Sequence, residues 1–418
     1  MERTKTIQAF AREFILPYVP FLLLLVFFTP TAGHGWDTEC WTEWAKHHYQ
    51  HGLSNIYKSG TDYLPLYHYV LFAYARMQPN IESIAQNIHY LKYITLLFEF
   101  TSTVMLGRLL FNAFHDRYKS LFYSLFYLLN AGILYNSLIW GQVDGIMSFF
   151  VFASVLAAYQ KRLFLSILCL VLALNMKLQA IIFLPLVIAL IIPAIQKSYK
   201  TIILTLAGIL VVQFVIILPF IWVGDFLRLK DVVLGSVGKY PVISMNAYNL
   251  WVFVFDRNTN LMQTPDSTVF LGSTCKLWGL VFFFIAGFAA LAHFIKPLYQ
   301  YLFRKQYINF PFRDVLISSA LIPLVFFFFN TQMHERYSHP AFIFLAAYAL
   351  LYKRLHLLII GSFAYFLNLE DVLQVLHTNN YDTLVFMSRF IAGLYLLLIL
   401  LLYIDLFSPI LKRKHNGT

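Results

Sequence analysis

The sequence predicts an all-α integral membrane protein with about 12 transmembrane helices and a long first extracytoplasmic loop that carries short interfacial helices. Of its 418 residues, 60% are apolar and only 12% are charged, whereas soluble domains carry about 25% charged residues. The apolar residues gather in runs close to the roughly 20 residues that a spanning helix needs. No long polar block interrupts them, so residues 1–418 are predicted to form a single polytopic membrane domain.

The apolar runs occur at 14–32, 88–112, 120–139, 145–159, 163–176, 178–195, 201–222, 270–295, 314–330, 340–352, 355–369 and 384–407. The first run shows no small-residue cleavage site, and it is predicted to be a retained span rather than a cleaved signal. The three cysteines, Cys40, Cys169 and Cys275, are far apart in the sequence. They form no C-x-x-C motif, so the sequence indicates neither a disulfide framework nor a zinc site.

The charges of the short loops orient the spans. Arg3, Lys5 and Arg12 precede the first run and place the N-terminus inside by the positive-inside rule. Each loop that then falls inside is basic, with Arg117, Lys119, Lys161, Arg162, Lys197, Lys200, Lys296, Arg304, Lys305, Arg313, Lys353, Arg354, Lys412, Arg413 and Lys414. Both termini are predicted inside. Because topology accounts for the net charge of +11, no nucleic-acid partner is predicted.

The first outside loop, predicted at 33–87, contains the most informative segment, GWDTECWTEWAKHHYQHG at 35–52. Asp37 follows the first span directly, and much of the segment is predicted to form a short amphipathic helix at the membrane surface. Glu39 and Glu43 are one helical turn apart and share a face. A carboxylate at a water-poor boundary can act as a general base toward a hydroxyl group. The alternative for Asp37 is a solvated loop acid or a helix N-cap.

Two polar segments lie at the ends of later apolar runs. WGQVDG, at 140–145, contains Gln142 and Asp144, which either contact a substrate or belong to a plain turn between two glycines. MKLQA, at 176–180, places Lys177 at membrane depth, where an ionisable residue indicates function. A lysine on the acidic outside face suits an anionic ligand. The alternative is a lysine that extends to the lipid headgroups.

A second long outside loop is predicted at 223–269. It contains SMNAYNLW, in which Asn246, Tyr248 and Asn249 offer hydrogen-bonding and stacking groups that suit sugar rings. The same residue types also suit an ordinary turn with an aromatic anchor at the membrane surface.

QMHERYSHPA, at 332–341, is the densest polar cluster and stands at the start of an apolar run. The zinc-protease pattern H-E-x-x-H would need a histidine where Ser338 stands, so a zinc protease is rejected. Arg336, next to His334 and Glu335, is predicted to lie at a helix N-terminus, where the helix dipole and free N–H groups favour a phosphate.

In this order and on one predicted face, these segments resemble the GT-C superfamily of polytopic membrane glycosyltransferases. Within it they resemble most the bacterial and archaeal mannosyltransferase-like members and the eukaryotic glucosyltransferases that act on dolichol-linked oligosaccharide. The likeness extends over roughly residues 10–350. The family has an acidic residue after the first span, matched by Asp37, and a D-Y-P-P-L-like segment, matched by Asp62, Tyr63, Leu64, Pro65 and Leu66. Its W-G-Q-x-D motif is matched by Trp140, Gly141, Gln142 and Asp144. Its N-A-Y-N-L-W motif is matched by 246–251, and its H-E-[RK] motif by His334, Glu335 and Arg336. Leu64 departs from the pattern, which has a proline there.

The resemblance implies an inverting hexosyltransferase. It would move a sugar, with mannose as the first candidate, from a polyprenyl-phosphate donor to a glycan or lipid-linked acceptor on the extracytoplasmic face. Asp37 is then the general base, and Arg336, His334 and Lys177 hold the donor phosphate. The predicted substrate contacts are Asp62, Tyr63, Gln142, Asp144, Asn246, Tyr248, Asn249 and Glu335.

No cofactor is implied. A divalent metal near Asp37 and Asp144 is compatible with the sequence, but no ligand spacing demands one. Membrane lipids are the remaining predicted partners. The predicted location is a bacterial inner membrane, with the active face toward the periplasm.

The alternative is a transporter or flippase of a lipid-linked sugar. Such a protein is expected to place charges near the bilayer midplane and to show broken helices in two related halves. In this sequence the polar clusters gather on one predicted face and no internal repeat is evident. This asymmetry favours an enzyme. A scaffold would leave the concentrated motifs unexplained.

Overall fold

The computed structural model describes residues 11–195, 199–236 and 238–415. Arg3, Lys5 and Lys197, which contribute to the topology prediction, lie outside the described residues. The chain divides into two compact units. Unit 1 comprises Met1–Leu129, Leu134–Ile181 and Ala194–Lys239, and unit 2 comprises Asn130–Ile133, Ile182–Pro193 and Tyr240–Thr418.

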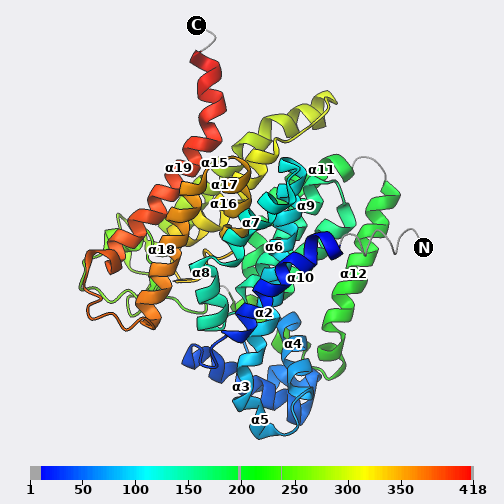
Figure 1. Cartoon of the computed structure of the whole chain (residues 1–418), viewed down its shortest axis with the longest axis vertical. Coiled ribbons are helices and arrows are strands. Elements are labelled where there is room, and N and C mark those ends of the chain that lie inside the picture. The colour runs from blue at the N-terminus through cyan, green and yellow to red at the C-terminus, as the bar shows by residue number, and fades with distance from the viewer. Residues whose placement is uncertain (1–10, 196–198, 237, 416–418) are drawn as a thin grey trace. The chain divides into compact units, whose positions relative to one another are not determined.

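The described residues of unit 1 form helices that are joined by turns and loops. Its α-helices are α2 (Val19–Phe27), α3 (Gly35–His51), α4 (Pro65–Arg76), α5 (Ile81–Gln86), α6 (Leu91–Phe114), α7 (Arg117–Leu128), α9 (Asp144–Tyr159), α10 (Leu163–Met176), α12 (Tyr199–Trp222) and α13 (Phe226–Gly235) (Figure 1). Short 3₁₀ or π segments are η1 (Ala11–Ile15), η2 (Leu16–Tyr18), η3 (Leu53–Ser59), η4 (Ile88–Tyr90), η5 (Tyr135–Trp140) and η6 (Leu178–Phe183), the last of which extends into unit 2. Helix α9 packs against α6 and α10 and forms the centre of the unit.

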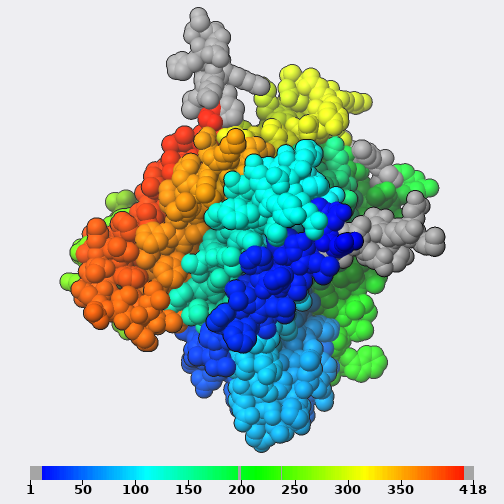
Figure 2. Space-filling model, viewed as in Figure 1, coloured from blue at the N-terminus to red at the C-terminus, as the bar shows by residue number. Residues whose placement is uncertain are grey.

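The N-terminal segment of unit 1 is less regular than a continuous span over 14–32. It passes through η1 and η2 into α2, which ends at Phe27. Pro17 lies in the first turn of η2, a position that tolerates its missing N–H. The segment packs on α6 and α7, and the Tyr18 hydroxyl lies 2.7 Å from Ser124 Oγ. In the space-filling view it runs across the visible face as a dark blue strip (Figure 2).

The helices α3, α4 and α5 gather at one end of unit 1 (Figure 1). Helix α3 ends at Gly52, whose φ of 75° is in the left-handed region that glycine adopts without strain. Its inner face buries Trp41, Trp44 and His48 against α4. Helix α3 thus includes most of the segment predicted to form an interfacial helix. Its position at a membrane surface remains a prediction.

Unit 2 contains the second set of helices and four very short strands. The helices are α8 (Ala131–Leu134), α11 (Leu184–Ile195), α14 (Trp251–Val254), α15 (Cys275–Arg304), α16 (Phe312–Phe329), α17 (Ala341–Leu351), α18 (Leu355–Leu373), α19 (Ser388–His415) and the 3₁₀ turn η7 (Leu384–Phe386); α8 and α11 extend slightly beyond the unit. The core lies in α16 and α17, where nearly every residue is buried.

The strands of unit 2 bring two of the motifs together. Strand β1 (Ser244–Met245) pairs in parallel with β4 (Met333–His334), with Met245 opposite His334. Strands β2 (Val269–Phe270) and β3 (Ser273–Thr274) form a separate antiparallel pair. The segment that leads into N-A-Y-N-L-W therefore lies beside the segment that leads into H-E-R.

Seven helices in the described part of the chain are long and apolar enough to cross a membrane, at Ile88–Phe114, Leu178–Ile195, Tyr199–Trp222, Cys275–Arg304, Phe312–Phe329, Leu355–Leu373 and Ser388–Ser408. Arg117–Leu128 and Ala131–Trp140, bent by 50°, make an eighth if the pair is one span. Helices α9, α10 and α17 are apolar but shorter. An all-α fold with several membrane-spanning helices is therefore supported, whereas the larger number of about 12 spans stays a prediction.

Candidate active site

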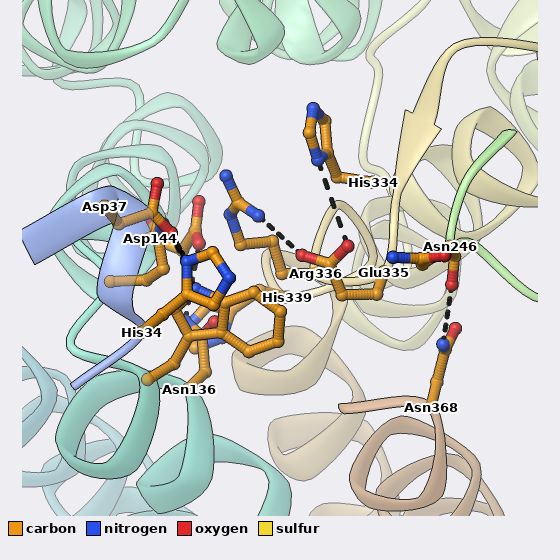
Figure 3. Close-up of polar contacts among 12 residues, drawn as sticks. His34, Asp37, Asn136, Asp144, Asn246, His334, Glu335, Arg336, His339 and Asn368 are labelled. Carbon is orange, nitrogen blue, oxygen red and sulfur yellow. Dashed lines mark hydrogen bonds and ion pairs between the residues drawn. The ribbon is translucent and has the colours of Figure 1, made fainter. Parts of the chain in front are cut away.

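The carboxylate of Asp37 is the centre of a hydrogen-bond cluster in unit 1. Asp37 stands in the first turn of α3, and its side chain is 17% exposed. Its Oδ2 accepts hydrogen bonds from Trp140 Nε1 at 2.7 Å and Gln142 Nε2 at 2.6 Å. The His34 imidazole lies 3.0 Å from the same oxygen (Figure 3) and, because a carboxylate only accepts, it donates from Nδ1. Three N–H groups thus fix the orientation of this carboxylate.

The W-G-Q segment reaches Asp37 because of a turn at Gly141. Gly141 has a φ of 89°, which a side chain would strain, and it ends η5 so that Gln142 follows in a new direction. The backbone N–H of His34 donates to Trp140 O at 2.9 Å. The His34 ring also stacks on the Trp140 indole, with centroids 4.7 Å apart. These contacts join two segments that are about 100 residues apart in the sequence.

Lys92 holds the backbone that leads into α3. It is 3% exposed, and its ammonium donates to Pro30 O at 2.8 Å and also to Ala32 O. A Cβ at Gly33 would lie 2.8 Å from the Thr38 methyl group, so only glycine fits this close approach. The turn before Asp37 is therefore fixed by a buried cation and by tight packing.

Asp144 and Lys177 form a buried ion pair in unit 1. Lys177 Nζ lies 2.5 Å from Asp144 Oδ1, and the side chains are 14% and 1% exposed, respectively. Asn136 donates a longer hydrogen bond, 3.4 Å, to Asp144 Oδ2 (Figure 3). The charge of Lys177, predicted to face a phosphate, is balanced by Asp144. A phosphate at this position would have to share the ammonium with that carboxylate.

Asp62 and Tyr63, from the D-Y-P-P-L-like segment, lie just before α4 and are both partly exposed. Asp62 forms an ion pair with Lys239, with both side chains about one-third exposed. The Tyr63 ring packs among Trp41, Trp44 and Tyr67, with centroids between 5.2 and 5.9 Å. The segment contributes to the packing of the α3–α4 layer, and its contact with a substrate stays a prediction.

The H-E-R cluster lies in unit 2. Arg336 Nη1 donates to Glu335 Oε1 at 2.5 Å, and His334 Nδ1 lies 3.9 Å from Glu335 Oε2 (Figure 3). Glu335 and Arg336 are 2% and 9% exposed. Helix α17 begins only at Ala341, so the prediction that Arg336 lies at a helix N-terminus is wrong. The helix field weakens beyond its first turn, and Arg336 must act through its own charge.

The N-A-Y-N-L-W segment is fixed by side chains of α18. Asn368 donates to Asn246 O at 2.8 Å (Figure 3) and accepts from Tyr248 N at 3.1 Å. The Tyr248 hydroxyl donates to Asp371. Burial first, and the Asp371 charge second, raise the pKa of Tyr248 well above its usual value. Tyr248 therefore stays protonated and acts as a hydrogen-bond donor.

Asn249 has a structural role. It is fully buried, its amide donates to Phe327 O at 3.1 Å and Asn330 O at 3.2 Å, and its carbonyl accepts from Trp251 N. These bonds satisfy the last carbonyls of α16 and the first turn of α14. With its donors and acceptor so engaged, Asn249 is the least suited of the predicted residues to contact a substrate.

Sequence reasoning overlooked His34 and Lys92. His34 precedes Asp37 by three residues, a spacing at which side chains meet on one face of a helix. Lys92 stands near the start of a long apolar run, and a lysine there is itself a signal of function. Asn368 and Asp371 lie in the last 70 residues, where the sequence offered no motif.

Comparison with known proteins adds no assignment. No protein-family model matches this chain, and no curated protein matches its sequence. Within the described residues, no group of three or more His, Cys, Asp or Glu side chains is arranged to hold a metal ion. The functional argument therefore depends on the residues and their geometry.

Proposed function

We propose that this protein is an inverting hexosyltransferase that uses a polyprenyl-phosphate-linked sugar, with the fold type of the GT-C superfamily. The observation that carries the proposal is the carboxylate of Asp37, whose Oδ2 accepts N–H groups from His34, Trp140 and Gln142. A carboxylate in a solvated loop is hydrated by water and is not held by three N–H donors. A carboxylate held in one orientation next to a membrane suits a general base that acts on a lipid-borne substrate.

In the proposed reaction, Asp37 takes the proton of an acceptor hydroxyl as that oxygen attacks the anomeric carbon. The bond from that carbon to the phosphate oxygen breaks, so the configuration inverts and polyprenyl phosphate leaves. Proton transfer is assigned to the Asp37 carboxylate, whose Oδ2 accepts the three N–H groups. The three donors hold the carboxylate plane in one orientation, which lowers the entropic cost of reaching the reactive geometry.

Negative charge grows on the phosphate as it leaves, and a cation stabilises it. Lys177 and Arg336 each pair with a carboxylate, Asp144 and Glu335, respectively. A guanidinium has five N–H donors in a planar fork, so it can bond a carboxylate and a phosphate together more readily than an ammonium can. Arg336 is therefore the preferred phosphate ligand, and His334 and Lys177 remain candidates.

A transporter of a lipid-linked sugar is the second candidate. The buried pair of Asp144 and Lys177 favours it, because ion pairs inside membrane proteins often mark a transport path. Asp144, however, is the first residue of α9, and Lys177 directly follows the last residue of α10. Charges at helix ends are closer to a membrane surface than to its midplane, which favours the enzyme.

Substitution of Arg336 by Ala is expected to weaken donor binding about 10- to 100-fold, because a charge-assisted hydrogen bond to phosphate is lost. Free polyprenyl phosphate should lose affinity by the same factor, since it carries the same group. Both are titrated on folded, detergent-solubilised protein. Arg336→Lys is the matched variant, and it should retain part of the affinity. Unchanged donor affinity and turnover in Arg336→Ala would remove this residue from the site.

The proposal also includes about 12 spans, with both termini inside and the segments 33–87 and 223–269 on the extracytoplasmic side of a bacterial inner membrane. Ser59 and Asn258 lie in these segments and are exposed. Ser59 is preferred to Gly60, whose φ of 77° disfavours a cysteine. A membrane-impermeant maleimide should modify Ser59→Cys and Asn258→Cys in intact cells, in a variant without native cysteines. Gln160→Cys should react only after lysis, and the reverse pattern would contradict this topology.

A further inference from the structure

A cavity lies in unit 1 between the second half of α3, the start of α5 and η3. Its volume is about 310 Å³, within the range of roughly 300–1,000 Å³ typical of small-molecule sites. Its walls are formed chiefly by Glu43, Trp44, Lys46, His47, Gln50 and Ser59, with Ile81 as an apolar neighbour. Neither the base Asp37 nor any residue predicted to hold phosphate takes part in it.

The charges around the cavity cancel. Glu43 Oε1 accepts from Lys46 Nζ at 2.8 Å, so these two charges form a neutral pair. His47 Nε2 lies 3.0 Å from Asn55 O, to which it donates. Burial chiefly, together with the neighbouring His51 and Lys58, lowers the pKa of His47, so its ring is neutral at physiological pH. The residues that line the cavity offer no unbalanced positive charge to a phosphate or another anion. The ligand that fits is polar and uncharged.

The hydrogen-bonding groups of the cavity suit a polyol. Gln50 is exposed, and no residue in the described part of the chain hydrogen-bonds its amide, which offers both donors and an acceptor. Trp44 is only 9% exposed, but its indole N–H keeps contact with solvent. An incoming hydroxyl oxygen can accept a hydrogen bond from this N–H, while the Trp44 ring and Ile81 provide apolar contact.

We propose that this cavity is a binding site for a neutral saccharide. Trp44 and Gln50 follow Asp37 on the same helix, at about 10 and 20 Å along its axis by the 1.5 Å rise per residue. A single sugar that reacts at Asp37 cannot extend so far. The cavity therefore holds a sugar unit several positions from the reacting hydroxyl, and the acceptor is an oligosaccharide. The identification of this saccharide as part of the acceptor rests on the proposed function, whereas the saccharide site itself does not.

The test is a titration of the full-length protein in lipid nanodiscs, free of glycoside detergents, with mannotriose, maltotriose and cellotriose. At least one of these is expected to bind at millimolar concentration or below. Gln50→Ala and Trp44→Phe should each weaken binding about 5-fold, the effect of one lost hydrogen bond. Ser59→Trp should abolish it by filling the cavity. Gln86→Ala removes an exposed amide from α5, outside the cavity wall, and should bind as the unaltered protein does.

Three results would overturn the proposal. They are no binding of any trisaccharide, an affinity in both Gln50→Ala and Ser59→Trp equal to that of the unaltered protein, or displacement of the trisaccharide by inorganic phosphate. Because Gln50 is exposed, its variant folds even if Trp44→Phe does not. The same titration on Asp37→Asn separates this proposal from the proposed function. Trisaccharide binding that depends on Gln50, together with full transfer by Asp37→Asn, would keep the saccharide site and reject Asp37 as the base.

Discussion

Asp37→Asn is expected to lower the turnover of sugar transfer by about 10²- to 10⁴-fold, the usual effect of losing a general base. Asn has the same shape, and its carbonyl oxygen can still accept from Trp140 and Gln142, so the local geometry should persist. What it loses is the ability to take a proton. Donor affinity should not change, because the donor is recognised through its phosphate. Single-turnover kinetics and a donor titration on the same purified protein measure both quantities.

Glu39→Gln is the matched control for this experiment. Glu39 lies two residues further along α3 and is exposed, so the same chemical change is made outside the hydrogen-bond cluster. Its turnover should equal that of the unaltered protein. Transfer near the normal rate by Asp37→Asn would instead move the base to Glu39, Glu43 or Asp144.

Lys177→Met is expected to destabilise the protein by about 3–5 kcal/mol, since it leaves the Asp144 carboxylate buried without its counter-charge. Asp144 is only 1% exposed, so water cannot replace the ammonium there. The double variant Asp144→Asn with Lys177→Met removes both charges and should recover most of this stability. Denaturant or thermal unfolding of detergent-solubilised protein measures the free energy of unfolding of the unaltered protein, the single variant and the double variant.

The double variant also separates packing from chemistry. If Lys177 and Asp144 serve only as each other's partner, the stable double variant should transfer sugar at a normal rate. If it also contacts the donor phosphate, donor affinity should stay low after stability has returned. A Lys177→Met variant as stable as the unaltered protein would show that the ion pair contributes nothing to folding.

The long apolar helices could be predicted from the sequence, because apolar runs bounded by charged loops indicate where such helices form. Asp37 and the W-G-Q-x-D segment could each be selected as polar exceptions in an apolar chain. Their contact could not be predicted. It depends on the left-handed turn at Gly141 and on the close approach at Gly33, which arise from packing between distant segments.

Local turn chemistry explains the errors. Helix α17 begins at Ala341 because Pro340 precedes it, and residues before a proline are biased away from helical backbone angles. Arg336 is therefore separated from the start of α17. Pro340, which indicates this helix boundary, could already be seen in the sequence. Pro17 lies where the first apolar run changes from π-helix to 3₁₀ geometry. The partners of Tyr248 on α18 lie in a segment without recognisable motifs, so only the folded chain reveals them.

The sequence separation within the Asp37 cluster has a consequence for biosynthesis. Trp140 and Gln142 lie 103 and 105 residues after Asp37. A ribosome adds about 5–20 residues per second, so Asp37 emerges about 5 to 20 s before its partners are made. During that interval His34 is the one cluster donor already synthesised. A nascent chain arrested before Trp140 would hold the proposed base in its membrane-anchored fragment and yet lack the orientation that catalysis requires.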